Sequence, residues 1–585
     1  MRMIMTLARS LRQHKKGSVI TICLSILEAG FEIIIPLCMS GLIDYGVDQG
    51  NMSEVWKYGI ILIIFALLQL VTGLASAKIC ARTSAGFCAN LRQDMYDNVQ
   101  AFSFSNIDKF STASIVTRLT TDVNNIQNSY QMLLRMAIRG PVMIIFAMIV
   151  SFSINKEISL VFLVCIPVLA ILLFLIVRNV NPIFKRVFQT YDTLNNVVQE
   201  NVRGIRVVKS FNQEEGEIRK FSGISEKIFR DFAKGERLIA FNMPLMQLAM
   251  YSCMILISWL GAKAIIASGN HPALGLTTGN LTALISYATQ ILTSLMMLSM
   301  VFAIMTISVS SAQRIAEIIN EKTDISNPET PVKEVRNGNI DFNGVSFVYA
   351  SKADKKVLDH VDLHFKSGET IGVLGGTGSS KSSLVQLIPR LYDVTEGSVQ
   401  VGGVDVREYD LETLRESVAM VLQKNELFSG TIAENLRWGN ETATDEEIRH
   451  ACKLACADEF IQTFPDQYET HIEQGGTNVS GGQKQRLCIA RALLKKPKVL
   501  ILDDSTSAVD TKTDAIIQKS FAQYIPETTK IIIAQRVSSV QHADQIVVLD
   551  DGKVVAVGKH DQLIKTCGIY REVYQSQQKG DSDNG

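Results

Sequence analysis

Residues 371–383 read IGVLGGTGSSKSS, a short apolar run followed by a loop of glycine, serine and threonine that contains one lysine. A helical pattern follows, so the stretch predicts a strand, a loop and a helix of the kind that holds phosphate groups with backbone N–H groups. Lys381 is expected to reach the outer phosphates of a nucleotide, and Ser382 to bind Mg²⁺. Ser380 stands where this motif ordinarily has its second glycine. The predicted phosphate-binding residues are Gly375, Gly376, Thr377, Gly378, Ser379, Ser380, Lys381, Ser382 and Ser383.

Several β-branched runs surround this loop in the sequence. They occupy 345–349, 370–374, 418–422, 499–502, 530–533 and 545–549, and helical patterns separate several of them. The alternation predicts an α/β domain with a largely parallel sheet. The run 499–502 ends in Asp503, a position at which such domains place a carboxylate beside Mg²⁺. We predict this nucleotide-binding domain at 337–577, after a linker at 321–336 and before a disordered tail at 578–585.

The part of the chain before the linker is rich in long apolar runs. The whole chain of 585 residues is 47% hydrophobic, and six stretches before residue 310 are long enough to cross a bilayer as helices, which takes about 20 residues. They lie near 17–42, 55–77, 132–152, 158–177, 241–267 and 281–308. The sequence therefore predicts an all-α membrane domain of six transmembrane helices at 1–320.

The distribution of lysine and arginine predicts the orientation of these helices. Basic residues precede the first stretch, and the segments after the second and fourth stretches are long, basic and helical in pattern. We expect both termini, these long extensions and the nucleotide-binding domain in the cytosol of a multi-pass plasma-membrane protein, with the lipid bilayer as a partner. The 58 basic and 58 acidic residues balance, which argues against nucleic acid as a partner.

Two carboxylates lie inside the first apolar stretch. Glu28 and Glu32 are four residues apart, which places them on one face of a helix. An intramembrane carboxylate is costly, so the pair is a candidate contact for a cationic substrate. The alternative is that the side chains reach water or a neighbouring helix, which Glu32 would do from a place near the outer end beside Pro36.

Residues 479–486 read VSGGQKQR, shortly before the predicted strand at 499–502. This stretch resembles the signature motif of the ATP-binding cassette (ABC) family. The order of the motifs also resembles that family: Tyr349, the phosphate-binding loop, Gln423, the signature, Asp503, and then Ser507-Ala508-Val509-Asp510. Segments 105–122 and 201–211 look like the two intracellular loops of the exporter branch. The resemblance covers essentially the whole chain and implies a half-size exporter, with six membrane helices fused to one ABC nucleotide-binding domain.

The resemblance implies roles for residues outside the phosphate-binding loop, with ATP and Mg²⁺ as cofactors. Tyr349 would stack on adenine, and Gln423 would contact Mg²⁺ together with Ser382 and Asp503. The signature residues would complete the nucleotide site of a facing subunit, so that one chain alone cannot build a complete site. These residues are Ser480, Gly481, Gly482 and Gln483.

Three residues depart from the pattern that the resemblance implies. Active family members have a glutamate after the Mg²⁺ aspartate to position the attacking water, and this chain has Asp504. Shortening the side chain by one methylene withdraws the carboxylate by about 1.5 Å, and misplacement on the order of 1 Å can cost about a hundredfold in rate. The family's switch histidine is replaced by Gln535, which forms hydrogen bonds but carries no imidazolium charge. With Ser380, these changes predict a site that binds ATP and hydrolyses it poorly; neutral drift in a still-active site is the alternative.

This asymmetry resembles the degenerate-site subunit of bacterial heterodimeric multidrug exporters. We therefore expect a second, homologous half-transporter as partner and hydrophobic small molecules, lipids or peptides as substrates. Hydrolysis would occur mainly at the site that holds the partner's nucleotide. Two alternatives remain at this point: a homodimeric lipid or peptide exporter, and an ATP-gated regulatory subunit that does not pump.

Overall fold

The computed structural model describes residues 2–271, 275–349, 355–504 and 510–582. The chain divides into two compact units, one formed by residues 1–100 and 111–321 and the other by residues 101–110 and 322–585. The sequence prediction missed one feature of this division. The short segment 101–110 belongs to the second unit, although residues of the first unit flank it on both sides.

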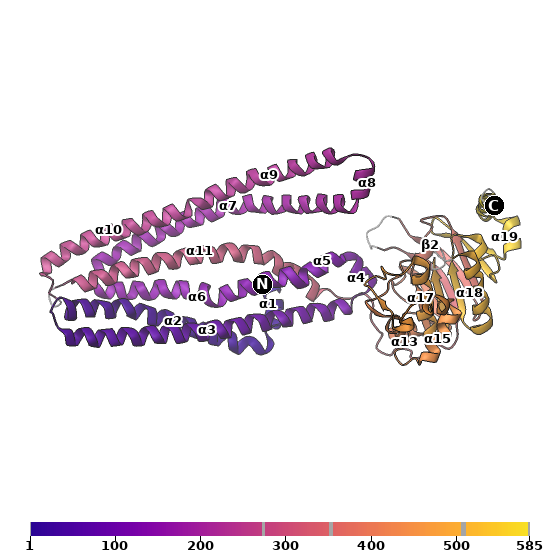
Figure 1. The fold of residues 1–585 in the computed structure, drawn as a ribbon, viewed down its shortest axis with the longest axis horizontal. Helices are drawn as coiled ribbons and strands as arrows, with labels where there is room; N and C mark the ends of the chain where they lie inside the picture. Colours follow the sequence, from indigo (N-terminus) through magenta and orange to yellow (C-terminus); the bar gives the residue numbers. More distant parts are fainter. Residues whose placement is uncertain (1, 272–274, 350–354, 505–509, 583–585) are drawn as a thin grey trace. The chain divides into compact units, whose positions relative to one another are not determined.

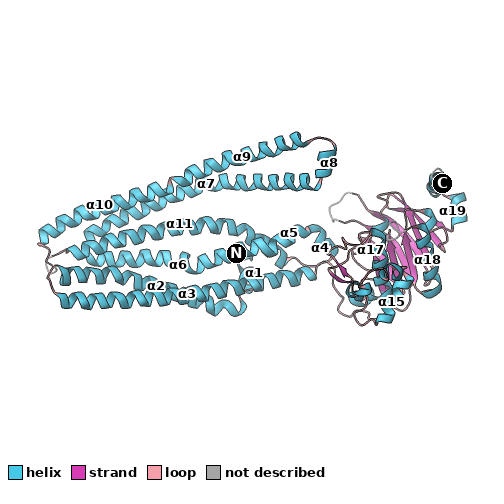
Figure 2. Ribbon diagram, viewed as in Figure 1, coloured by secondary structure: helices cyan, strands magenta, loops and turns pink. Residues whose placement is uncertain are grey.

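The first unit consists, in its described elements, of helices (Figures 1 and 2). Among the described residues, six helical segments are long and apolar enough to span a membrane, and they contain the six predicted stretches apart from the last residues of the sixth. The segments are Arg12–Val47, Met52–Gln100, Thr112–Ile154, Lys156–Arg203, Glu214–Ser268 and Thr278–Phe302. The α-helices of this unit are α1 (Arg2–Arg9), α2 (Lys15–Gly41), α3 (Met52–Gln100), α5 (Thr112–Thr117), α6 (Val123–Ile154), α7 (Lys156–Arg203), α8 (Ile205–Ser210), α9 (Glu214–Ala240), α10 (Asn242–Ser268) and α11 (Thr278–Asn320).

The first and last spans are tied together deep in this unit. Tyr287 on α11 is fully buried, and its hydroxyl donates to the backbone oxygen of Ile33 on α2 at 2.7 Å. A buried phenol needs such a partner, because leaving it unsatisfied in an apolar surrounding is costly. The helices α7 and α9 run side by side, with α8 at their junction (Figure 1). The rings of Phe184 and Phe232 pack edge to face across this pair, with centroids 5.6 Å apart.

The described residues of the second unit form three sheets. The main one has the order β12-β11-β3-β10-β9-β6, in which every neighbouring pair is parallel except β11 with β12. All residues of β9 and β10 are buried, which explains why their sequences are almost continuously apolar. The strands of this sheet are β3 (Thr370–Gly375), β6 (Val418–Val421), β9 (Val499–Asp503), β10 (Thr529–Ile533), β11 (Gln545–Asp550) and β12 (Lys553–Gly558).

A four-stranded antiparallel sheet and a short pair of strands accompany the main sheet. The run at 345–349, predicted as part of a largely parallel sheet, falls partly in β1 of this antiparallel sheet. Its strands are β1 (Ile340–Phe347), β2 (Leu358–Phe365), β4 (Glu396–Val401) and β5 (Val404–Asp405), and the short pair is β7 (Gly430–Thr431) with β8 (His471–Ile472). The main helices of the unit are α4 (Phe104–Lys109), α12 (Lys381–Gln386), α13 (Leu411–Ser417), α14 (Ile432–Arg437), α15 (Asp445–Leu454), α16 (Asp458–Ile461), α17 (Gly481–Leu494), α18 (Thr511–Tyr524), α19 (His560–Thr566) and α20 (Gly568–Ser582).

Both ends of the second unit differ from the predicted boundaries. The segment predicted as a linker at 321–336 pairs with this unit, since Val332 forms a bridge with Tyr409 and Asn327 donates to Asp410 at 2.6 Å. At the other end α20 continues to Ser582, five residues into the tail that was expected to be disordered from 578.

Candidate nucleotide-binding site

The phosphate-binding loop joins β3 to α12, as the sequence predicts. Gly375 closes the strand where a Cβ atom would lie 2.3 Å from the carbonyl oxygen of Leu549, so no larger residue fits. Ser380 has a φ of 71°, in the left-handed region that glycine adopts most easily. The backbone therefore keeps the glycine-like conformation at the position where the sequence has serine.

Lys381 curls over this loop. Its Nζ lies 2.8 Å from the carbonyl oxygens of both Gly375 and Gly376 and 3.3 Å from the hydroxyl of Ser379. Burial lowers the pKa of the Lys381 amine, while the nearby carboxylates of Asp504 and Asp503 act in the opposite direction. The amine thus occupies the concave side of the loop, where the phosphates of a nucleotide would lie.

Ser382 and Asp503 form the oxygen pair expected for Mg²⁺. The Ser382 hydroxyl donates to the Asp503 carboxylate at 3.0 Å, and Asp503 is only 2% exposed. Burial raises the pKa of the Asp503 carboxyl, which an adjacent cation would reverse. Hydroxyl and carboxylate oxygens are hard ligands that suit Mg²⁺, so these two residues fit the ion that the phosphate-binding loop implies.

Asp504 and Gln535 meet at the ends of neighbouring strands. The Gln535 amide donates to the Asp504 carboxylate with 2.7 Å between Nε2 and Oδ2, and Gln423 forms a hydrogen bond with the same carboxylate. Burial raises the pKa of Asp504, although these hydrogen bonds and the charge of Lys381 oppose the shift. The structure thus brings together the two predicted catalytic positions, Asp504 and Gln535, and one predicted Mg²⁺ contact, Gln423. Ser507, Ala508 and Val509 lie outside the described residues, and Asp510 caps α18 by accepting from the Thr513 backbone N–H at 2.9 Å.

The signature residues form the N-terminus of α17. Ser480 is the N-cap and exchanges hydrogen bonds with Gln483 at 2.9 and 3.3 Å, while Gly481 and Gly482 form the first turn. This reciprocal arrangement fixes the start of a 14-residue helix. Two residues without bulky side chains leave the positive end of the helix approachable by an anion.

Comparisons with known proteins agree with this arrangement. Residues 18–296 match the family of ABC transporter transmembrane regions, and residues 358–507 match the ABC transporter family. The chain is 35% identical over 558 residues to the ABC transporter ATP-binding protein YfiB of Bacillus subtilis, covering 95% of this chain and 96% of that protein. The chain belongs to the ABC transporter family.

Two further proteins resemble this transporter over most of its length. An ATP-dependent lipid A-core flippase of Desulfotalea psychrophila is 33% identical over 471 residues, which are 80% of each protein. A bacterial Atm1-family ABC exporter, solved with ATP bound, has the same fold with a TM-score of 0.82 at 22% identity, over 96% of this chain and 99% of that one. The chain thus joins an ABC transporter membrane region to an ABC transporter ATP-binding domain, in the fold of an ABC exporter.

The adenine-binding candidate of the transporter, Tyr349, packs between the phosphate-binding loop and a second tyrosine. Its hydroxyl lies 2.8 Å from the Ser383 hydroxyl, and its ring lies edge to face with Tyr392 at 5.1 Å. Tyr392 in turn donates to Asp108 of α4 at 2.7 Å and packs against Phe104 of the same helix at 5.9 Å. Tyr392 therefore joins the candidate nucleotide site to the segment 101–110. No local sequence pattern predicted this role.

A residue near the C-terminus of the transporter holds the switch position. The side-chain amide of Gln577 on α20 accepts from the backbone N–H of Val537 and donates to the backbone oxygen of Gln535, both at 2.8 Å. A side-chain amide that pairs with backbone on both sides of one residue fixes the local chain path in the way a neighbouring strand would. The sequence analysis missed Gln577, because its polar helix has no motif around this position.

The intramembrane carboxylates of the transporter have an internal counter-ion. Arg139 on α6 lies 3.2 Å from Glu28 and 2.5 Å from Glu32, and Glu28 is 7% exposed. A Cβ atom on Gly73 of α3 would lie 3.2 Å from the Glu28 carboxylate, so the glycine makes room for it. Of the two sequence interpretations, the contact with a neighbouring helix describes both side chains, and the partner is an arginine that the sequence analysis did not single out.

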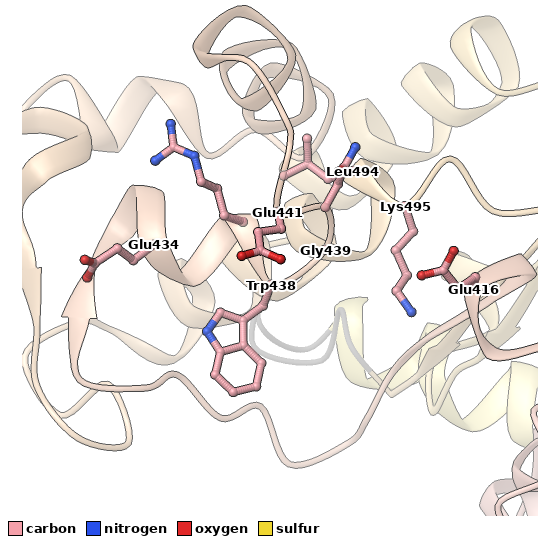
Figure 3. Close-up of a pocket in the computed structure, with 9 residues that line it drawn as sticks. Glu416, Glu434, Trp438, Gly439, Glu441, Leu494 and Lys495 are labelled. Carbon is pink, nitrogen blue, oxygen red and sulfur yellow. The ribbon is translucent and has the colours of Figure 1, made fainter. Parts of the chain in front are cut away.

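A cavity of about 800 Å³ in the second unit lies apart from these nucleotide residues. Trp438 and Glu441 line it, with Glu434 on one side and Glu416 with Lys495 on the other (Figure 3). The indole of Trp438 stacks on Phe428 at 4.1 Å with an interplanar angle of 8°. The mixed charges of the cavity and the exposed indole of Trp438 suit contact with a polypeptide better than with a nucleotide.

Proposed function

We propose that this chain is the degenerate-site half of a heterodimeric ABC exporter in the plasma membrane. In this proposal both termini and the nucleotide-binding domain are cytosolic, and the assembled pair moves hydrophobic or amphipathic compounds outward. The observation that carries the proposal is the hydrogen bond between Gln535 and Asp504, the two positions at which hydrolysis should be controlled.

This hydrogen bond explains why ATP would bind here and turn over slowly. A carboxylate that accepts from a neighbouring amide is a weaker base toward a water molecule than a free one of the same reach. Gln535 brings no positive charge to a developing γ-phosphate. Lys381, Ser382 and Asp503 nevertheless keep the geometry for the phosphates and Mg²⁺, so binding is retained.

The signature helix supports the requirement for a partner. The N-terminus of α17 offers free backbone N–H groups in a glycine turn, and in a dimer it would face the γ-phosphate held by the other half. This chain would then contribute a complete signature to a site whose catalytic residues come from the companion. ATP in the chain's own site would mainly hold the two domains together.

The helix α8 supports coupling between the nucleotide and membrane domains of the pair. Val207 and Phe211 lie where α8 joins α7 to α9. Their side chains are 60% and 70% exposed, which is unusual for large apolar residues outside the lipid. We propose that they contact the nucleotide-binding domain of the partner, so that closure of the two domains moves α7 and α9. Exposed aromatic rings such as Phe428 and Trp438 would form the matching surface.

A homodimeric lipid exporter is the second candidate function. The relative named as a lipid A-core flippase favours it, because that protein shares four-fifths of its length with this chain. In that case both sites would carry Asp504 and Gln535, and turnover would be slow at both.

The two candidates differ in what the purified chain does alone. We expect slow ATP hydrolysis and no pumping by the chain alone in sealed vesicles, and brisk hydrolysis with pumping when it is co-expressed with a homologous half-transporter that has the glutamate and histidine. Brisk hydrolysis and pumping by the chain alone would overturn the heterodimer proposal.

A further inference from the structure

The membrane unit contains a second cavity that the nucleotide chemistry does not use. It measures about 670 Å³ and lies among α3, α6 and α11. The described residues lining it are Ala77, Cys80, Ala81, Asn125, Asn128, Gln131, Met132, Arg135, Met136, Ile304 and Ser308. The predicted span at 55–77 ends here, the span at 132–152 begins here and the span at 281–308 ends here, so the cavity lies at one boundary of the apolar layer.

Two arginines one helical turn apart on α6 have opposite surroundings. Arg139 lies against two carboxylates, Glu28 and Glu32. Arg135 lines the cavity, and neither a carboxylate among the described lining residues nor an ion pair elsewhere in the described chain neutralises it. A charged side chain at the edge of the apolar layer is ordinarily paired or hydrated, so Arg135, which has no ion-pair partner among the described residues, is available to an anion in the cavity.

The polar side chains beside Arg135 are hydrogen-bond donors held in place. Gln131 donates to Ser84 at 2.9 Å and Asn125 donates to Ser311 at 3.2 Å, which fixes both amides between helices. Each of these amide groups has a second N–H that can donate to a ligand. The side chain of Asn128, on the exposed side of α6, adds a third amide to the cavity lining. Guanidinium and amide donors together suit the oxygens of a carboxylate or phosphate group.

The rest of the lining is apolar and adaptable. Met132, Met136 and Ile304 line the cavity together with Ala77 and Ala81. Methionine side chains repack around ligands of varied shape because they are unbranched and polarisable. The cavity thus joins a cationic, donor-rich part to an apolar part.

From this combination we infer that the cavity binds an anionic amphiphile, with its acidic group at Arg135 and its apolar chain along the methionines. The inference rests on the proposed export function, because it names the class of compound that would be exported. That class is single-chain lipids or drug-like acids rather than organic cations. It also replaces Glu28 and Glu32 as the substrate contact, because Arg139 already neutralises one of their two charges.

Binding measured without ATP tests the inference separately from transport. We would reconstitute the chain with its companion half-transporter in phosphatidylcholine nanodiscs and count bound ligand by native mass spectrometry. The probes are oleoyl lysophosphatidate, oleoyl lysophosphatidylcholine with the same chain and no net charge, oleyl trimethylammonium, and inorganic phosphate. We expect lysophosphatidate to bind at least about tenfold more tightly than the other three probes. The two lipids without a net negative charge lose a hydrogen bond to a charged group, which is worth that much, and inorganic phosphate lacks the apolar chain that the methionines would bury.

Variants at Arg135 then assign the effect to this residue. Arg135→Gln should lose the preference for lysophosphatidate, Arg135→Lys should keep most of it, and Arg135→Glu should favour oleyl trimethylammonium. Lys78→Gln, an exposed cation on α3 that does not line the cavity, is the matched control and should leave binding unchanged. Unaltered thermal melting and gel-filtration profiles show that each variant is folded.

Each outcome decides the inference. Equal binding of lysophosphatidate by the wild type and Arg135→Gln would overturn it, and so would inorganic phosphate binding as tightly as the lipid, which would indicate a site for a free anion. A pair that binds lysophosphatidate through Arg135 and transports nothing would contradict the export function and leave the anion site standing. A pair that pumps and does not bind lysophosphatidate through Arg135 would contradict the anion site and leave the export function standing.

Discussion

The Gln535 amide and the Asp504 carboxylate are hydrogen-bonded to each other at 2.7 Å, across the C-terminal ends of the paired parallel strands β9 and β10. The two departures from the family pattern therefore form one local unit. A longer carboxylate and an imidazole at these positions would need a different arrangement, so the two changes are coupled.

Restoring both residues should restore hydrolysis at this site. For the variant Asp504→Glu with Gln535→His we expect the ATPase rate of the assembled pair to rise, because the carboxylate regains about 1.5 Å of reach and misplacement of that order costs up to about a hundredfold. Steady-state phosphate release, compared with each single change, measures the effect. The degenerate-site argument fails if the double variant and the wild type turn over at the same rate.

The serine in the phosphate-binding loop is held in a conformation that glycine prefers. Ser380 has a φ of 71°, and a left-handed conformation costs a residue with a side chain about 1–2 kcal/mol. Replacing Ser380 with glycine would remove this cost. The greater freedom of glycine in the unfolded chain offsets part of the benefit, so Ser380→Gly should raise the free energy of unfolding by up to about 1 kcal/mol.

Thermal melting with and without Mg-ATP measures this effect. The neighbouring change Ser379→Gly is the control and should destabilise, because Ser379 is 4% exposed and its hydroxyl contacts the Lys381 amine. A loss of stability in both variants would show that the left-handed serine carries no strain.

The clamp formed by Gln577 should hold the switch segment in place. Gln577→Ala removes the acceptor of the Val537 N–H and the donor to the Gln535 carbonyl, and we expect a loss of about 1–2 kcal/mol from two hydrogen bonds. Hydrogen–deuterium exchange of the peptide that contains Val537 should become faster. The exposed Gln575 on the same helix provides the control, since Gln575→Ala should leave this exchange unaltered. Equal protection in both variants would mean that α20 does not position the switch.

The charge cluster between α2 and α6 should be needed for stability. Arg139→Ala leaves two carboxylates without their counter-ion, and breaking a buried ion pair on one side costs about 3–5 kcal/mol. Adding Glu28→Gln and Glu32→Gln should recover much of this loss. Arg135→Ala, one helical turn away on α6, is the control variant. It should have little effect on the melting temperature, because it breaks no ion pair. Similar losses for the two arginine variants would contradict the assignment.

The hydroxyl of Tyr392 should couple the nucleotide site to α4. Tyr392→Phe keeps the ring contacts with Tyr349 and Phe104 and removes the hydrogen bond to Asp108, so we expect ATP affinity to hold while substrate-stimulated hydrolysis falls several-fold. A double-mutant cycle with Asp108→Ala measures the coupling. Strictly additive effects would show that this pair transmits nothing.

Features governed by neighbouring residues were predictable from the sequence. Six apolar runs of sufficient length became six membrane-length helices, because a helix satisfies its own backbone and needs only a suitable run of side chains. The phosphate-binding loop and the strand that ends in Asp503 followed from local turn and strand patterns.

Features governed by distant partners were not predictable in this way. Glu28 and Arg139 are 111 positions apart, and nothing in the periodicity around either residue indicates the other. The same holds for Gln577 and Gln535, 42 positions apart, and for the assignment of residues 101–110 to the second unit.

The amino-acid sequence by itself determined that the chain has a six-helix membrane part and a phosphate-binding domain, and it predicted catalytic roles for Asp504 and Gln535. Only the tertiary structure decided that Asp504 and Gln535 bind each other, that Arg139 has carboxylate partners while Arg135 has none among the described residues, and that the Gln577 amide holds the backbone on both sides of residue 536. The physical reason is that backbone hydrogen bonding and side-chain periodicity act over a few residues, whereas charge pairing and cavity formation depend on which helices and strands pack together.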